Sequence, residues 1–122
     1  MNTPKSKTIL CIDDDSINRM VLKHLLNAMG FGVESAASGE EGLTILKEKA
    51  IDLVLLDIYM PQMDGFETAA AIRELISGIP IVFISAGEDK HLVEKMKKLA
   101  ITHFLAKPIE KDTLQKVLEQ LL

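Results

Sequence analysis

Tryptophan is absent from this chain of 122 residues, and its aromatic side chains are one tyrosine and four phenylalanines. The hydrophobic core is therefore expected to be aliphatic. The single cysteine, Cys11, excludes a disulfide within the chain, and no cysteines and histidines stand at the spacing of a zinc site. Because Cys11 lies in an apolar run, we expect a small buried side chain. A free thiol fits a cytoplasmic location, which is our prediction.

The chain also lacks an excess of positive charge and a long hydrophobic run. Its formal net charge is −4, which argues against nucleic acid as a direct partner, since phosphate backbones attract a basic face. No apolar stretch approaches the roughly 20 residues of a membrane-spanning helix. The stretch from Met1 to Lys7 is short and polar, unlike a signal peptide. We expect no membrane insertion.

The length fits one domain, which we expect to span residues 1–122. Short apolar runs alternate with amphipathic stretches of helical periodicity. This strict alternation predicts a parallel sheet with helices on both faces. Asp15 is expected to cap the first helix and Asp64, before Gly65, to cap the third. The expected strands cover 8–12, 31–37, 52–56, 81–84 and 102–106, and the expected helices cover 17–29, 38–50, the stretch from the Gly65 turn through 76, the region near 89–98, and a final stretch that ends near 121.

Polar side chains follow four of the five predicted strands. In open α/β sheets, ligands bind at the carboxyl ends of the strands. The aspartates 13–15 follow the first strand, Asp57 the third, Ser85 the fourth and Lys107 the fifth. Neighbouring carboxylates repel one another unless a cation lies among them, and hard oxygen ligands suit Mg²⁺.

This set of side chains fits phosphoryl transfer. An aspartate can act as the nucleophile and form an aspartyl phosphate. Mg²⁺ and a lysine ammonium would neutralise charge on the phosphoryl oxygens, and a serine hydroxyl would donate a hydrogen bond to one of them. In such a site the protein mainly positions groups and stabilises charge.

Four sequence segments carry a resemblance to a known family. The chain resembles the receiver domain of two-component response regulators, such as the chemotaxis regulators, over nearly its whole length. The resemblance implies a flavodoxin-like doubly wound α/β fold, with five parallel strands in the order 2-1-3-4-5 and five helices. The segments are Ile9-Leu10-Cys11-Ile12-Asp13-Asp14, the run from Asp52 to Gly65, Ile81-Val82-Phe83-Ile84-Ser85-Ala86, and Phe104-Leu105-Ala106-Lys107-Pro108.

The same resemblance implies a phosphoacceptor and a metal site. Asp57 would be the phosphoacceptor. Asp14 would bind Mg²⁺ directly, Asp13 would bind it directly or through water, and the backbone carbonyl of Tyr59 would complete the protein ligands. Mn²⁺ could substitute for Mg²⁺.

Three further residues receive roles from the resemblance. Ser85 and Lys107 would hold the phosphoryl oxygens, and Phe104 occupies the aromatic switch position, whose rotamer follows the movement of Ser85. Ser85 stands where many receivers have threonine, and Phe104 lacks the hydroxyl of the common tyrosine. The bond between Lys107 and Pro108 is expected to be cis, which X–Pro bonds permit.

The resemblance also implies partners. A histidine kinase or a histidine phosphotransfer protein would supply the phosphoryl group. Phosphorylation would change the face formed by the fourth helix, fifth strand and fifth helix, where a downstream protein docks. We expect a monomer or weak dimer that catalyses only its own phosphorylation and dephosphorylation. The pair Asn18-Arg19 is similar to receivers of hybrid histidine kinases, so a stand-alone regulator, a hybrid kinase and a longer regulator all stay open.

Three other functions fit the sequence less well. A phosphatase of the haloacid dehalogenase type needs a second aspartate two residues after its nucleophile, where this chain has Tyr59. A flavin-binding module of the same fold would place the flavin phosphate against the carboxylates of 13–15, which would repel it. A degenerate receiver that serves only as an interaction surface is disfavoured by the complete set of site residues.

Overall fold

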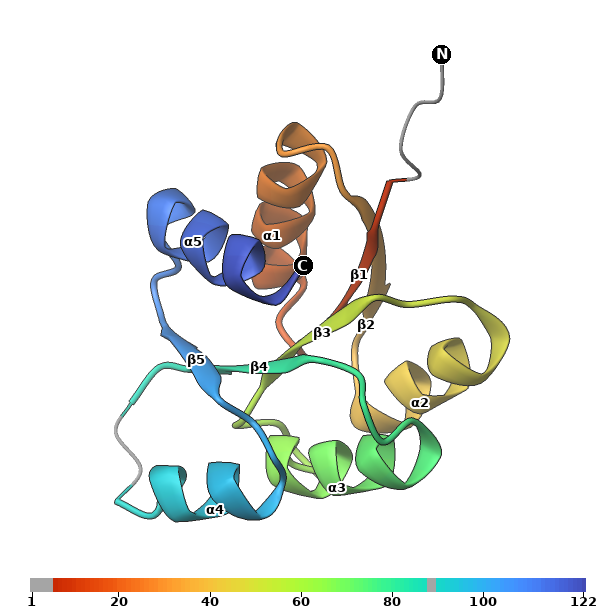
Figure 1. The fold of residues 1–122 in the computed structure, drawn as a ribbon, viewed down its shortest axis with the longest axis vertical. Helices are drawn as coiled ribbons and strands as arrows, with labels where there is room; N and C mark the ends of the chain where they lie inside the picture. The colour runs from red at the N-terminus through yellow and green to blue at the C-terminus, as the bar shows by residue number, and fades with distance from the viewer. Residues whose placement is uncertain (1–5, 88–89) are drawn as a thin grey trace.

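Strands and helices alternate strictly along the chain (Figure 1). This computed structural model describes residues 6–87 and 90–122, so residues 1–5 of the polar N-terminal stretch and Asp89 lie outside the described residues. The strands are β1 (Thr8–Ile12), β2 (Gly32–Ala36), β3 (Leu53–Asp57), β4 (Ile81–Ser85) and β5 (His103–Ala106). The helices are α1 (Ser16–Ala28), α2 (Gly39–Glu48), α3 (Gly65–Leu75), α4 (Leu92–Lys98) and α5 (Lys111–Leu121).

The strands form one parallel sheet in the order β2-β1-β3-β4-β5, which confirms the predicted flavodoxin-like topology. The register pairs Ile12 with Leu56 and Asp57 with Ile84. On the outer side of β4, Ser85 pairs with Ala106. The carboxyl ends of β1, β3, β4 and β5 therefore lie next to one another at one edge of the sheet.

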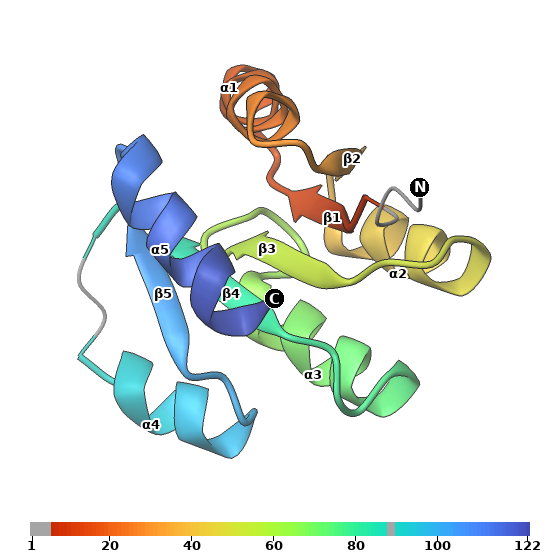
Figure 2. The same cartoon turned by 45° about the horizontal axis from the view of Figure 1, so that its top comes forward.

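Helices cover both faces of the sheet (Figures 1 and 2). Helices α1 and α5 pack on one face, where Leu26 and Leu118 join the apolar side chains of the central strands. Helices α2, α3 and α4 pack on the other face, and Ile72 and Met96 belong to that core. The core is largely aliphatic, as expected, and Cys11 is buried in it. Burial, with a smaller effect from the Asp13 charge, raises the pKa of the Cys11 thiol to about 12, so the thiol is not a ready nucleophile.

Two helices that begin at the carboxyl edge are capped by aspartates, as predicted. The Asp15 carboxylate accepts a hydrogen bond from the backbone N–H of Ile17 over 2.9 Å. Asp64 and Glu67 form a reciprocal capping box at the start of α3. Such caps satisfy N–H groups that have no partner within the helix. They fix where α1 and α3 begin relative to β1 and β3.

The start of α4 differs from the sequence prediction. The helix was expected to begin near residue 89, but it begins at Leu92, and its cap residue His91 makes no side-chain capping hydrogen bond. Because His91 makes no capping hydrogen bond, the first turn of α4 lacks the stabilisation that a side-chain cap gives. The other predicted boundaries agree with the structure to within about two residues. Within the described part of the chain, no helix has the length and apolar character needed to cross a membrane.

Candidate functional site

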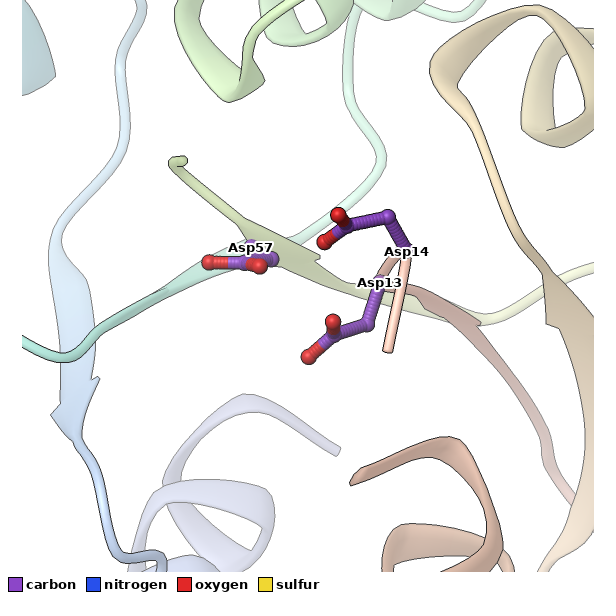
Figure 3. Close-up of side chains that lie close together, drawn as sticks. All are labelled: Asp13, Asp14 and Asp57. Atoms are coloured by element: carbon purple, nitrogen blue, oxygen red, sulfur yellow. The ribbon is translucent and has the colours of Figure 1, made fainter. Parts of the chain in front are cut away.

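Three aspartates converge at the carboxyl edge of the sheet (Figure 3). Asp13 directly follows β1, and Asp57 is the last residue of β3. Both residues are buried, with 1% and 3% of their surface exposed, whereas Asp14 is exposed. One carboxylate oxygen from each of the three lies within 4.8 Å of the others. The site therefore gathers up to three negative charges, two of them shielded from water.

Lys107 places a positive charge between the two buried carboxylates. Its Nζ lies 3.3 Å from Asp13 Oδ2 and 3.4 Å from Asp57 Oδ2. The backbone N–H of Lys107 donates to the carbonyl of Ser85 over 2.9 Å, which ties the end of β5 to the end of β4. The bond between Lys107 and Pro108 is cis, as the resemblance predicted.

The charges of the site shift the pKa values of Asp57 and Lys107. Burial, and next the charge of Asp13, raises the pKa of the Asp57 carboxyl to about 6, although Lys107 and a backbone N–H act in the opposite direction. Partial burial works to lower the pKa of Lys107, but the Asp57 and Asp13 charges outweigh it and the net shift is upward. One ammonium thus compensates the two buried carboxylates only in part.

The backbone after β3 holds Asp57 in place. The N–H of Tyr59 donates to Asp57 Oδ1 over 3.3 Å, and the N–H of Ile58 donates to the carbonyl of Ile84. Gly65 packs directly against this segment: a Cβ on it would lie 2.5 Å from the Asp57 carbonyl oxygen and 2.6 Å from the Ile58 Cα. The sequence marked Gly65 as a turn residue, but it gave no sign of this close backbone approach.

The three aspartates fit a divalent cation. Asp13 Oδ2 is buried and accepts no hydrogen bond, even though Lys107 lies within ion-pair distance. A buried anionic oxygen without a hydrogen-bond donor is unfavourable. Carboxylate oxygens are the ligands that Mg²⁺ prefers, and a cation among them would offset their repulsion. The donor set of Asp13, Asp14 and Asp57 therefore suits Mg²⁺.

Ser85 lies at the predicted edge, but its hydroxyl bonds elsewhere, and Phe104 lies within β5. Ser85 is buried, and its hydroxyl donates to the carbonyl of Gly87 over 2.7 Å and accepts from the Gly87 N–H over 3.2 Å. Phe104 on β5 is 50% exposed, as is Tyr59. The structure thus brings the three aspartates and Lys107 together and leaves the Ser85 hydroxyl within its own loop. The roles of Ser85, Phe104 and the Tyr59 carbonyl stay predictions.

Arg19 contributes to the site in a way that the sequence reading missed. Its Nη1 donates to the backbone carbonyl of Asp13 over 2.6 Å. A signal was available, because side chains of a helix lean toward its N-terminus, and Arg19 lies one turn after the cap residue Asp15. From the sequence, we interpreted Arg19 only as a similarity to receivers of hybrid histidine kinases.

Comparison with known families agrees with this fold and site. Residues 9–119 match the family model described as "Response regulator receiver domain". The chain therefore belongs to the family of response regulator receiver domains, and it carries an acidic pocket at the expected edge of the sheet.

Two curated relatives contain this domain as a small part of a longer chain. The transcriptional regulatory protein ZraR of Salmonella typhimurium strain LT2 is 37% identical over 114 residues, which are 93% of this chain and 26% of that protein. The sensor histidine kinase RcsC of the same strain is 34% identical over 110 residues, 90% of this chain and 12% of that protein. The chain thus spans about a quarter or less of these relatives.

Two solved structures have the same fold. The chemotaxis protein CheY4 of Vibrio cholerae superimposes with a TM-score of 0.92 at 30% identity, and the match covers 97% of this chain and 100% of that one. The response regulator TrrA of Thermotoga maritima, whose structure is a complex with Mg²⁺ and BeF, gives a TM-score of 0.84 at 32% identity over 95% of this chain and 99% of that one.

Proposed function

We propose that this receiver domain is a phosphorylation switch in which Asp57 accepts a phosphoryl group from a phosphohistidine of a partner histidine kinase or histidine phosphotransfer protein. The observation that carries the proposal is the convergence of Asp57 with Asp13, Asp14 and Lys107 at one edge of the sheet. We take residues 1–122 as one such domain. We place it in the cytoplasm as a monomer or weak dimer without direct contact to nucleic acid.

The transfer step needs a nucleophile, space for the phosphodonor and a positive charge near the phosphoryl oxygens. A carboxylate oxygen of Asp57 attacks the phosphorus, the O–P bond forms, and the N–P bond of the phosphohistidine breaks. The electron pair of that bond goes to the imidazole nitrogen, which takes up a proton. Lys107 would bind a phosphoryl oxygen, which its distance of 3.4 Å from Asp57 Oδ2 supports. A hollow of about 420 Å³, whose lining includes Asp13, Lys107 and Pro108, adjoins these two charged groups.

Asp13, Asp14, Asp57 and the backbone carbonyl of Tyr59 would hold Mg²⁺, for which Mn²⁺ could substitute. When bound, Mg²⁺ neutralises charge on the phosphoryl oxygens. The Asp13 Oδ2 atom, which is buried and accepts no hydrogen bond, supports this assignment, as does the similarity to TrrA, which was solved with Mg²⁺ and BeF.

The output would follow from Ser85 and Phe104. The Ser85 hydroxyl would exchange its bond to Gly87 for a bond to a phosphoryl oxygen, and the half-exposed Phe104 ring would turn inward. These movements would change the face of α4, β5 and α5, where a downstream protein docks. Attack of water on the phosphorus then breaks the O–P bond, releases inorganic phosphate and restores Asp57, so the domain catalyses only its own phosphorylation and dephosphorylation.

The test is incubation of the protein with acetyl phosphate and Mg²⁺, followed by intact mass spectrometry. We expect the mass of one phosphoryl group on the wild type and none on Asp57→Asn. Asp52→Asn, which changes an exposed carboxylate at the opposite end of β3, serves as the matched control and should be labelled like the wild type. Labelling of Asp57→Asn equal to the wild type, or no labelling of any protein, would overturn the proposal.

A further inference from the structure

Arg19 lies in the first turn of α1 and contacts the loop that carries the aspartates. Its guanidinium donates to the Asp13 carbonyl over 2.6 Å, and its backbone N–H donates to the Asp15 carbonyl over 3.1 Å. Hydrogen bonds from a charged donor are stronger than neutral ones. Arg19 therefore binds the loop with both its side chain and its backbone, on either side of Asp14.

The other groups of this loop are already fixed. The Asp13 N–H donates to the Ala36 carbonyl over 3.1 Å, and the Asp15 N–H donates to Asp13 Oδ1 over 2.9 Å. The peptide that joins Asp13 to Asp14 is held at its carbonyl by Arg19. Because a peptide unit is planar, the direction of this carbonyl determines where the backbone nitrogen and Cα of Asp14 lie, and the Asp14 side chain starts from that Cα.

Asp14 is the aspartate that most needs such a restraint. It is exposed, yet one of its carboxylate oxygens lies within 4.8 Å of those of the buried Asp13 and Asp57. Repulsion among the three charges favours movement of the exposed carboxylate into water. Resting on the proposed function, we propose that Arg19 is a positioning residue, which holds the Asp13–Asp14 peptide so that Asp14 is preset for the divalent cation.

The guanidinium has two opposing effects on a cation at this site. Its charge repels the cation, whereas its hydrogen bond keeps a ligand in place. Arg19 is partly exposed and its guanidinium donates to a carbonyl, so solvent and salt screen its charge. The geometric effect depends on a short, direct contact and is not screened in this way. The positioning effect therefore dominates, and removal of Arg19 weakens cation binding.

Titration of the unphosphorylated protein with Mg²⁺, followed by isothermal calorimetry, separates the two effects. We expect Arg19→Gln to raise the dissociation constant for Mg²⁺ about tenfold, the lower end for residues that support metal ligands. Arg19→Lys keeps the charge but loses the planar donor group, so its dissociation constant for Mg²⁺ should fall between those of the wild type and Arg19→Gln. Tighter binding by Arg19→Gln, or binding by both variants equal to the wild type, would overturn the inference.

The matched control is Arg73→Gln, at the other arginine of the chain. The Arg73 guanidinium also donates to backbone carbonyls, those of Leu99, Ala100 and Ile79, but at the far end of α3 from Gly65. We expect Arg73→Gln to lower the melting temperature without changing Mg²⁺ affinity. If it weakens Mg²⁺ binding as much as Arg19→Gln does, loss of stability explains both results and the inference fails.

A kinetic measurement adds a readout that a structural role would not move. Labelling of Arg19→Gln by acetyl phosphate should be slow at limiting Mg²⁺ and should recover at saturating Mg²⁺. A defect that persists at saturation contradicts the inference. If Arg19→Gln does not fold, Arg19→Lys carries the same test. A wild type that neither binds Mg²⁺ nor is labelled refutes the proposed function, whereas Arg19 variants equal to an active wild type refute this inference alone.

Discussion

The two ends of the sheet differ in whether their polar groups are buried or exposed. At the carboxyl end, Asp13, Asp57 and Ser85 are buried, and they are three of the four buried polar or charged residues found in the described ranges 6–87 and 90–122. At the amino end, the Asp52 carboxylate accepts the Thr8 N–H over 2.8 Å in an exposed position. A hollow of about 520 Å³ there is lined largely by apolar side chains such as Met29, Phe31 and Leu118.

The difference shows that the carboxyl end buries charged groups at the expense of stability. Burial of a charge is unfavourable unless the charge is paired and hydrogen-bonded. Lys107 compensates Asp13 and Asp57 in part, and Asp13 Oδ2 stays without a hydrogen bond. A bound cation would complete the compensation. The amino end has no such requirement, because water solvates its charged groups.

The largest expected effect comes from a comparison of one glycine at each end. Gly65→Ala should destabilise the protein by about 3 kcal/mol or more, because the added Cβ would meet the backbone of Asp57 and Ile58 at 2.5–2.6 Å. Gly78, in the loop before β4, has no atom within 4 Å of its added Cβ. Gly78→Ala should change stability by less than about 1 kcal/mol. Urea unfolding measures both, and equal effects would contradict this difference between the ends.

The second prediction concerns the charge of Asp57. Its pKa is raised to about 6 in the folded protein from 3.8. Between these values the folded state binds more protons than the unfolded state, so the ionised carboxylate destabilises the fold, fully above about pH 6 and not below about pH 4. In EDTA, Asp57→Asn should therefore stabilise the protein at pH 7 by up to about 3 kcal/mol, with no gain near pH 3.5.

Thermal unfolding at several pH values measures this gain. Added Mg²⁺ should stabilise the wild type more than Asp57→Asn, since a ligand stabilises the state that binds it. A gain for Asp57→Asn that is the same at pH 3.5 and pH 7 would show that its origin is not the buried charge.

The smallest effect is expected at the amino end. Asp52→Ala removes the acceptor for the exposed Thr8 N–H and should cost about 0.5–1 kcal/mol, since water can replace the lost hydrogen bond. Mg²⁺ affinity and labelling by acetyl phosphate should stay at wild-type values. Calorimetry and mass spectrometry check this, and a clear loss of Mg²⁺ affinity would mean that the two ends are coupled through β3.

Most of the fold could be predicted because its signals are local. The apolar run of β3 and the helical periodicity of α1 specify their elements, and strict alternation favours a parallel sheet. The start of α4 was placed about three residues too early, and its cap residue His91 makes no side-chain capping hydrogen bond. The contact of Gly65 with the Asp57 backbone was not predictable, since no pattern in the sequence reports a close approach of two backbones.

By itself, the sequence determined the types and order of the elements and which polar residues follow the strands, because periodicity and strand ends are local properties of the chain. Only the tertiary structure decided that Asp13 and Asp57 are buried while Asp14 is exposed, and that the Ser85 hydroxyl binds Gly87. It also decided that the Arg19 guanidinium donates a hydrogen bond to the Asp13 carbonyl. Burial, a pKa near 6 and a hydrogen bond between elements depend on neighbours that the sheet brings together from distant parts of the chain.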